Sequence, residues 1–175
     1  MRAGDKILDA EGYGMVFRKT AADTNGELLE VDAYHRPQSS MPPRHYHPHQ
    51  EEEFTVVRGE FRVLLGDELH TYRRGDTFRV PAGISHSMHN VADHKGHLVW
   101  RVRPALNTEG LLAVTWKMER DRKSMSLGLR EILHLAVILQ AYEEELRLSS
   151  AGQYLLLQMV APLARLMGFK PTYGR

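Results

Sequence analysis

The sequence predicts a mainly β protein, built as a sandwich or small barrel, with an α-helical extension at its C-terminal end. Before Pro104, short apolar runs recur between glycine-containing turns, and after Pro104 the apolar residues take a helical spacing. Regular short strands are typical of sandwiches and barrels, whereas a 3.6-residue apolar period indicates helices. We therefore expect a β unit over residues 1–104 and a helical extension over residues 105–175, packed on the barrel or on a partner subunit.

The strand segments combine β-branched, aromatic and aliphatic residues in short runs. The dipeptides Asn25-Gly26, Gly59-Glu60 and Gly75-Asp76 are turn signals that separate several of them. The expected strands cover residues 15–19, 28–34, 54–57, 61–65, 69–72, 77–80 and 97–102, with a further strand that begins at His86.

Three helices are expected in the extension. Residues 107–121 form the first, and residues 126–146 form the second, which has a broad apolar face. Ser149-Ser150 are suitable N-cap residues for the last helix, which should end at Gly168 and be kinked at Pro162.

Composition limits the possible functions. The chain has 175 residues, a formal net charge of +1 and no cysteine, so disulfides and thiolate metal sites are excluded and any metal must have nitrogen and oxygen ligands. The near-neutral charge gives no reason to expect a nucleic acid or an anionic membrane as partner. No apolar stretch reaches the roughly 20 residues that span a bilayer, and no signal peptide is visible, so we expect a cytoplasmic protein.

A first histidine-rich segment has the spacing of a metal site. In a strand, His45 and His47 point to the same face while Tyr46 points away, so two imidazoles can bind one ion. The carboxylate of Glu52 follows shortly afterwards and would add an anionic ligand. A solvated polar loop is the alternative interpretation of this segment taken by itself.

A second segment supplies a further histidine. Gly75 ends a turn, Pro81 fixes the backbone, and Gly83 can adopt a conformation that other residues avoid. His86 then opens a strand, in which alternation places Met88 on the same face.

These two segments resemble the two motifs of the cupin superfamily. The match comprises His45, His47, Glu52 and Gly59 in the first motif, and Gly75, Pro81, Gly83, His86 and Asn90 in the second. Ser39 stands where the family usually has a glycine before the first histidine, which affects a turn and no ligand. The resemblance covers residues 28–103 and implies a double-stranded β-helix, that is, a jelly-roll barrel.

The resemblance also implies a site in which His45, His47, Glu52 and His86 bind one divalent transition metal (Fe, Mn, Ni, Co, Cu or Zn). Open coordination positions would allow a small-molecule substrate or dioxygen to bind. We expect an enzyme of oxygenase, isomerase or lyase type, in which Glu52 also accepts a proton. The alternative is a non-catalytic small-molecule-binding or sensor cupin. If the strand register differs by one residue, Glu51 or Glu53 replaces Glu52.

Alternation also gives candidates for the substrate pocket. The candidates are Phe54, Val56, Phe61, Val63, Phe78, Met88 and Arg101. The alternative interpretation is plain core packing for the apolar residues and a position on the protein surface for the arginine. The exposed strand edges and apolar helices suggest a homodimer. The last helices are too apolar to bind DNA, and packing against protein is favoured over membrane association.

Overall fold

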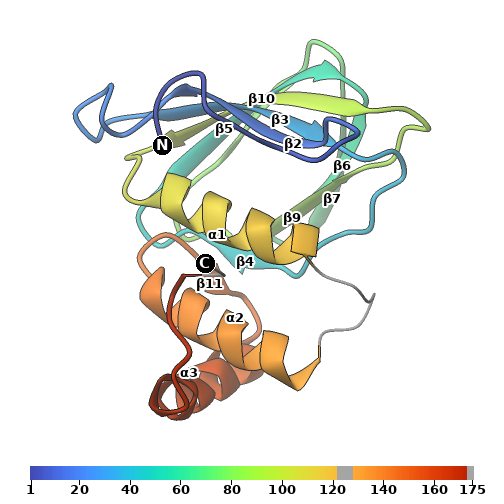
Figure 1. The fold of residues 1–175 in the computed structure, drawn as a ribbon. Helices are drawn as coiled ribbons and strands as arrows, with labels where there is room; N and C mark the ends of the chain where they lie inside the picture. Colours follow the sequence, from blue (N-terminus) through green and yellow to red (C-terminus); the bar gives the residue numbers. More distant parts are fainter. Residues whose placement is uncertain (122–127, 173–175) are drawn as a thin grey trace.

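The computed structural model describes residues 1–121 and 128–172, which form two antiparallel sheets facing each other, with helices along one side (Figure 1). The first sheet has the order β1-β2-β3-β10-β5-β8, with bounds Lys6–Leu8, Gly14–Lys19, Leu29–His35, Gly96–Arg103, Glu51–Arg58 and Thr77–Val80. The second has the order β11-β4-β9-β6-β7, with bounds Arg147–Leu148, His45–Tyr46, His86–Asn90, Glu60–Leu65 and Glu68–Arg73. This confirms the predicted jelly-roll architecture with a helical extension.

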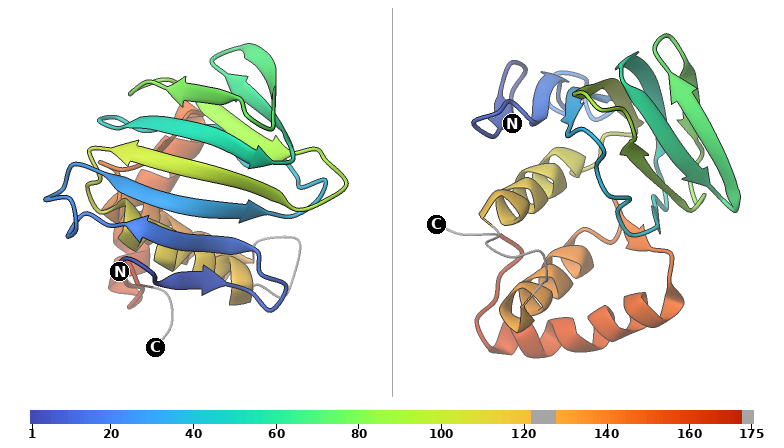
Figure 2. Two further views of the ribbon diagram at one scale, coloured as in Figure 1. Left: turned by 90° about the horizontal axis from the view of Figure 1, so that it is seen from above. Right: turned by 90° about the vertical axis from the view of Figure 1, so that its right-hand side faces the viewer.

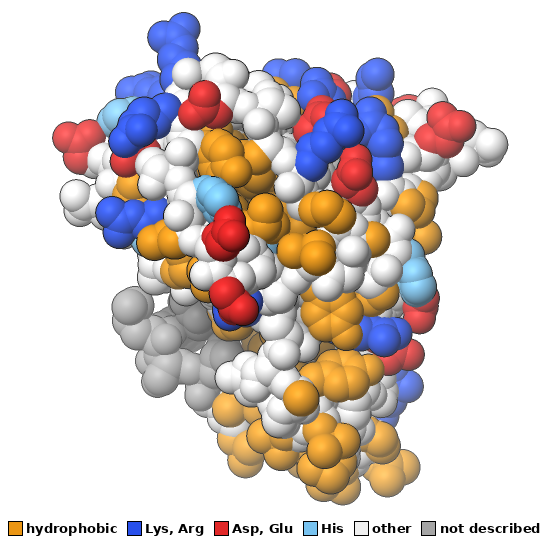
Figure 3. Space-filling model, turned by 180° about the vertical axis from the view of Figure 1, so that it is seen from behind, with side chains coloured by type: hydrophobic (Ala, Val, Ile, Leu, Met, Phe, Trp, Pro, Cys, Tyr) orange, Lys and Arg blue, Asp and Glu red, His pale blue; other side chains and the backbone are white. Residues whose placement is uncertain are grey.

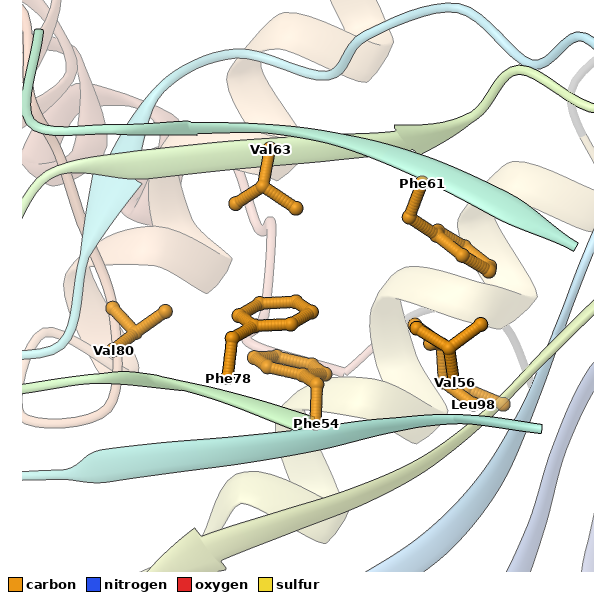
Figure 4. Close-up of a cluster of buried hydrophobic side chains, with 8 residues drawn as sticks. Phe54, Val56, Phe61, Val63, Phe78, Val80 and Leu98 are labelled. Atoms are coloured by element: carbon orange, nitrogen blue, oxygen red, sulfur yellow. The ribbon is translucent and has the colours of Figure 1, made fainter. Parts of the chain in front are cut away.

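The main core lies between the two sheets. Figure 4 shows its side chains converging from both sheets, and the strand pattern explains why, since buried and more exposed residues alternate along β5 and β6. Burying side chains of this size contributes about 1.5–3 kcal/mol each. The cluster comprises Ala33, Phe54, Val56, Phe61, Val63, Phe78, Val80 and Leu98.

The helices are α1 (Thr108–Asp121), α2 (Leu129–Ala141) and α3 (Ala151–Leu166). Leu112 of α1 packs on the first sheet in a cluster with Phe17 and Val102. Ile138 of α2 packs against α1, and α2 and α3 share a separate cluster around Ala161. Figure 2 shows α2 and α3 beneath the sheets, on the side covered by α1. None of the helices in the described part of the chain is long and apolar enough to cross a membrane.

The second helix is shorter than predicted. It ends at Ala141, and the chain then turns and forms β11, while residues 126 and 127 lie outside the described part of the chain. The apolar spacing continued to Leu146 because this side chain packs in the cluster between α1 and α2 without being helical. For the last helix, Ser150 is the N-cap and accepts a hydrogen bond from the backbone N–H of Gln153. Gly168, with φ of +90°, follows its end.

Candidate metal centre

Three imidazoles converge at the second sheet. His45 lies in β4, His47 follows it, and His86 opens β9, where it is the register partner of His45. One ring nitrogen from each of the three lies within 4.8 Å of the others. His47 and His86 are buried, with 3% and 1% of their surface exposed. The spacing of the two sequence motifs therefore brings these histidines together.

Backbone carbonyl groups orient all three rings. Because each Nδ1 faces a carbonyl oxygen, Nδ1 carries the proton and donates, which leaves the lone pair of Nε2 available to a metal. The Nδ1–oxygen distances are 3.1 Å for His45 with Pro43, 2.5 Å for His47 with Glu145, and 3.3 Å for His86 with Ile84.

Glu52 lies beside the three histidines. It is 1% exposed, and its two carboxylate oxygens lie 3.2 Å from Nε2 of His47 and 3.0 Å from Nε2 of His86. Nε1 of Trp100 donates a hydrogen bond to Oε1 of Glu52 at 3.0 Å. Glu51 is exposed and Glu53 pairs with Arg79 on the outer face. Of the three consecutive glutamates, the strand register therefore turns Glu52 toward the site.

The electrostatics of the cluster depend on close contacts between buried groups. Burial by itself would raise the pKa of Glu52, but attraction by His47 and His86 outweighs it and holds this pKa well below its usual range. Burial, assisted by the neighbouring histidines, lowers the pKa of His45 to about 4. For His47, burial opposes protonation, but the carboxylate of Glu52 raises its pKa. Glu52 is therefore an anion next to imidazoles.

Two buried polar atoms at the centre of the cluster have no hydrogen-bond partner among the described residues. They are Nε2 of His47 and Oε2 of Glu52. An unsatisfied buried polar atom costs about 1–3 kcal/mol. A divalent cation would satisfy both atoms, because neutral imidazole nitrogen and carboxylate oxygen are metal ligands. These residues therefore fit a bound transition metal.

The C-terminal extension supports the histidine cluster. β11 pairs with β4, so that Leu148 is the register partner of His45. The Oε1 atom of Glu145 accepts a hydrogen bond from the backbone N–H of Asn107 at 3.0 Å, while its carbonyl oxygen contacts His47. The sequence analysis missed this support, because β11 is only two residues long and its neighbours extend a helical pattern.

Gly83 fixes the backbone beside the cluster from the other motif. Its φ of +77° confirms the expectation that a glycine is needed there. Its N–H donates to the carbonyl oxygen of His47 at 2.8 Å. The turn of the second motif thereby positions a histidine of the first.

A cavity of about 170 Å³ adjoins the cluster. Apolar side chains from both sheets form most of its wall. Its lining residues are Met15, Ala33, His35, Pro42, His45, Glu52, Phe54, His86, Met88 and Trp100. A small organic molecule could therefore reach the cluster.

The pocket candidates from the sequence divide into three groups. Phe54 and Met88 line the cavity. The other apolar candidates pack in the core between the sheets, as the alternative interpretation of core packing had it. They are Val56, Phe61, Val63 and Phe78. Arg101 differs from the expectation, because it lies on the outer face and pairs with Glu30 at 2.6 Å and with Glu53 at 3.0 Å. Its neighbour Trp100 takes the inward position, since adjacent strand residues face opposite sides.

The sequence analysis also missed His35. It is the last residue of β3, and alternation along that strand from the buried Val31 through Ala33 places it on the inner face. The signal was present in the sequence, but His35 lies before the first metal motif and matches no motif position.

Comparisons with known proteins find similarity within the β part of the chain. The model of the Cupin domain family matches residues 35–102, which include all four residues of the candidate centre. Over 60 residues the chain is 37% identical to Protein SchB of Streptomyces halstedii, and this match covers 34% of the chain and 44% of that protein.

Solved structures with a similar fold include two bacterial proteins. One is a conserved protein with a double-stranded β-helix domain from Klebsiella pneumoniae, with a TM-score of 0.48 and 20% identity over 57% of this chain and 80% of that one. The other is described as a predicted oxalate decarboxylase from Thermotoga maritima, with a TM-score of 0.48 and 14% identity over 57% of this chain and 99% of that one. The family model thereby identifies residues 35–102 of this chain as a cupin domain.

Proposed function

We propose that this protein is a metal-dependent enzyme that binds one divalent transition metal and acts on a small organic molecule. His45, His47, His86 and Glu52 would hold the ion. One observation carries the proposal: three imidazoles with their Nδ1 atoms tied to carbonyl groups converge beside a buried carboxylate, at the wall of a cavity. Fe, Mn, Ni, Co, Cu and Zn all accept this set of nitrogen and oxygen ligands.

The bound ion would supply Lewis acidity toward a substrate oxygen or would bind dioxygen, as an oxygenase, isomerase or lyase requires. The chain itself orients the imidazoles and excludes water with the apolar side chains of Phe54, Met88 and Trp100. Glu52 stays ionised near neutral pH because its pKa is held low. A group with so low a pKa is a weak proton acceptor, so its electrostatics favour a ligand role over the predicted catalytic one.

The second candidate function is a non-catalytic binding or sensor protein. The scarcity of polar groups in the cavity favours it. Apart from His45, Glu52, His86 and the indole N–H of Trp100, the only polar side chain among its lining residues is His35. This leaves few side chains at the cavity that could transfer a proton to or from a substrate.

Elemental analysis of the purified protein tests the metal, and substrate-dependent dioxygen uptake then separates the candidate functions. His86→Ala should lose the metal. His70→Ala, at a histidine that pairs with Glu68 in the other half of the sheet, should retain it and is the matched control. A wild-type protein without a transition metal would contradict the proposal. Metal without uptake or turnover of any substrate would favour the binding function. The homodimer and the cytoplasmic location stay predictions.

A further inference from the structure

We propose that His35 is the residue that recognises the polar end of the ligand in the cavity, and that the ligand has the size of a single aromatic ring. This inference rests on the proposed function, because it assumes that the other end of the ligand faces the metal centre.

The strand register aims His35 into the site. Along β3, Val31 and Ala33 are buried, whereas Glu30 and Asp32 engage arginines on the other face of the sheet. His35 continues the inner series and lines the cavity. His35 therefore places two polar ring nitrogens on a face of β3 that is otherwise apolar.

His35 has no hydrogen bond from either ring nitrogen to any residue in the ranges 1–121 and 128–172. Its ring instead contacts the edge of Phe61, with a centroid distance of 5.2 Å and an interplanar angle of 83°. The histidines of the metal centre each have Nδ1 bound to a carbonyl oxygen, and His97 is bound to Asp32 at 2.6 Å. Because the His35 side chain is half-buried and has no hydrogen-bonding partner in the described protein, its ring nitrogens are left to water or to a ligand. A bound ligand would provide that partner.

The protonation state of His35 fits this role. Burial lowers its pKa to about 4, so the imidazole is neutral near pH 7. A neutral imidazole offers one N–H donor and one acceptor lone pair. It can therefore bind a hydroxyl or carbonyl group without demanding a charge on the ligand.

Besides the residues of the candidate metal centre, the cavity wall carries one further imidazole, that of His35. His45 and His86 come from the second sheet, whereas His35 comes from β3 of the first and is not part of the histidine group that could hold a metal. Apolar side chains make up most of the remaining wall, among them Met15, Met88 and Phe54. This arrangement suits a molecule with two polar groups on an apolar body.

Size and lining restrict that body. A cavity of about 150 Å³ is sufficient for benzene, and this one measures about 170 Å³. Phe54 and Trp100 lie nearly parallel, with a centroid distance of 5.7 Å, and methionine sulfur contacts aromatic rings favourably. The ligand class is therefore a monocyclic aromatic compound with two polar substituents.

Two probes of matched shape test the assignment: 1,4-dihydroxybenzene and 4-methylphenol, in which a methyl group replaces one hydroxyl group. Their dissociation constants are measured by calorimetry, under nitrogen, for the metal-containing protein and its variants. In His35→Phe, the ratio of the dissociation constant of 1,4-dihydroxybenzene to that of 4-methylphenol should rise about tenfold over its wild-type value. This change corresponds to the loss of one hydrogen bond. His35→Asn, which keeps hydrogen-bonding groups, should retain part of the preference.

Metal content is measured in every sample, so that the two proposals can fail separately. An unchanged probe ratio in metal-containing His35→Phe would overturn the role of His35, and so would failure of both probes to bind the wild type. A wild-type protein that lacks metal but shows the His35-dependent ratio would overturn the proposed function and leave His35 as a ligand-binding residue.

Discussion

His47 donates a hydrogen bond from Nδ1 to the backbone carbonyl oxygen of Glu145, across a distance of 2.5 Å. The two residues are 98 positions apart in the sequence, so the C-terminal extension directly orients a residue of the candidate metal centre. Substitutions in the extension that disturb this contact should therefore change the affinity for the metal.

Glu145→Ala should weaken metal binding about tenfold, because removing the acceptor for the Asn107 N–H loosens the carbonyl group that orients His47. Competition with a chelator of known affinity measures the effect. Glu144→Ala is the matched control, since Glu144 is exposed and, within the described part of the chain, pairs with the exposed side chain of His49 and with Arg147. Equal affinities of the two variants would contradict the supporting role of Glu145.

Trp100→Phe should destabilise the protein by about 1.5–3 kcal/mol, the usual contribution of a hydrogen bond to a charged group. The substitution removes the indole N–H that binds Oε1 of Glu52 and keeps an aromatic ring beside Phe54. Urea denaturation of the metal-free protein gives the difference. A loss below about 0.5 kcal/mol would mean that Glu52 finds another donor.

Acid should destabilise the metal-free protein partly through His35. The pKa of His35 is about 4 in the folded protein, and an unfolded chain has a histidine pKa of about 6.5. Between these values the unfolded state binds a proton that the folded state does not, so the free energy of unfolding falls as pH falls through this window. From about pH 7 to about pH 5, the wild type should lose about 2 kcal/mol more than His35→Phe. Equal losses in urea denaturation would show that His35 is not protected from protonation.

Arg101→Ala should leave metal content and probe binding unchanged. The arginine pairs with Glu30 and Glu53 on the outer face of the first sheet, where partly exposed ion pairs contribute about 0–1 kcal/mol each. Thermal unfolding should show that the variant is slightly less stable than the wild type. High salt should make this difference smaller, because it screens the ion pairs of the wild type. Loss of probe binding would instead restore Arg101 as a pocket residue.

An exposed apolar face of α3 makes the predicted homodimer testable. Leu155, Met159, Leu163 and Leu166 are 59%, 63%, 58% and 87% exposed, and Figure 3 shows hydrophobic side chains gathered at the end of the molecule where α3 lies. Apolar patches of this kind mark contact surfaces. Leu163→Glu should convert a dimer to a monomer in sizing chromatography, whereas Arg62→Glu, on the exposed face of β6, should not. A monomeric wild type would contradict the dimer.

The sequence predicts this fold and the proximity of the candidate metal ligands because both depend on local patterns. Alternation predicted that Glu52 faces inward and Glu51 outward, and the resemblance to the two cupin motifs implied that His45 and His86 belong to one site; the structure has them as register partners. The support from Glu145 depends on contacts between distant segments, which local patterns do not contain. Arg101 was misplaced for a related reason: choosing between it and Trp100 requires the absolute register of β10 against β5, in which Trp100 is paired with Phe54.

The pairing of β11 with β4 has a consequence for any attempt to shorten the chain. Without residues 147–148, the strand that carries His45 would become the open rim of its sheet, with unsatisfied backbone groups available to other chains. A fragment that stops near Pro104, where the sequence pattern changes, should therefore aggregate and fail to retain a cation. We therefore expect the shortest stable fragment to extend at least to Leu148.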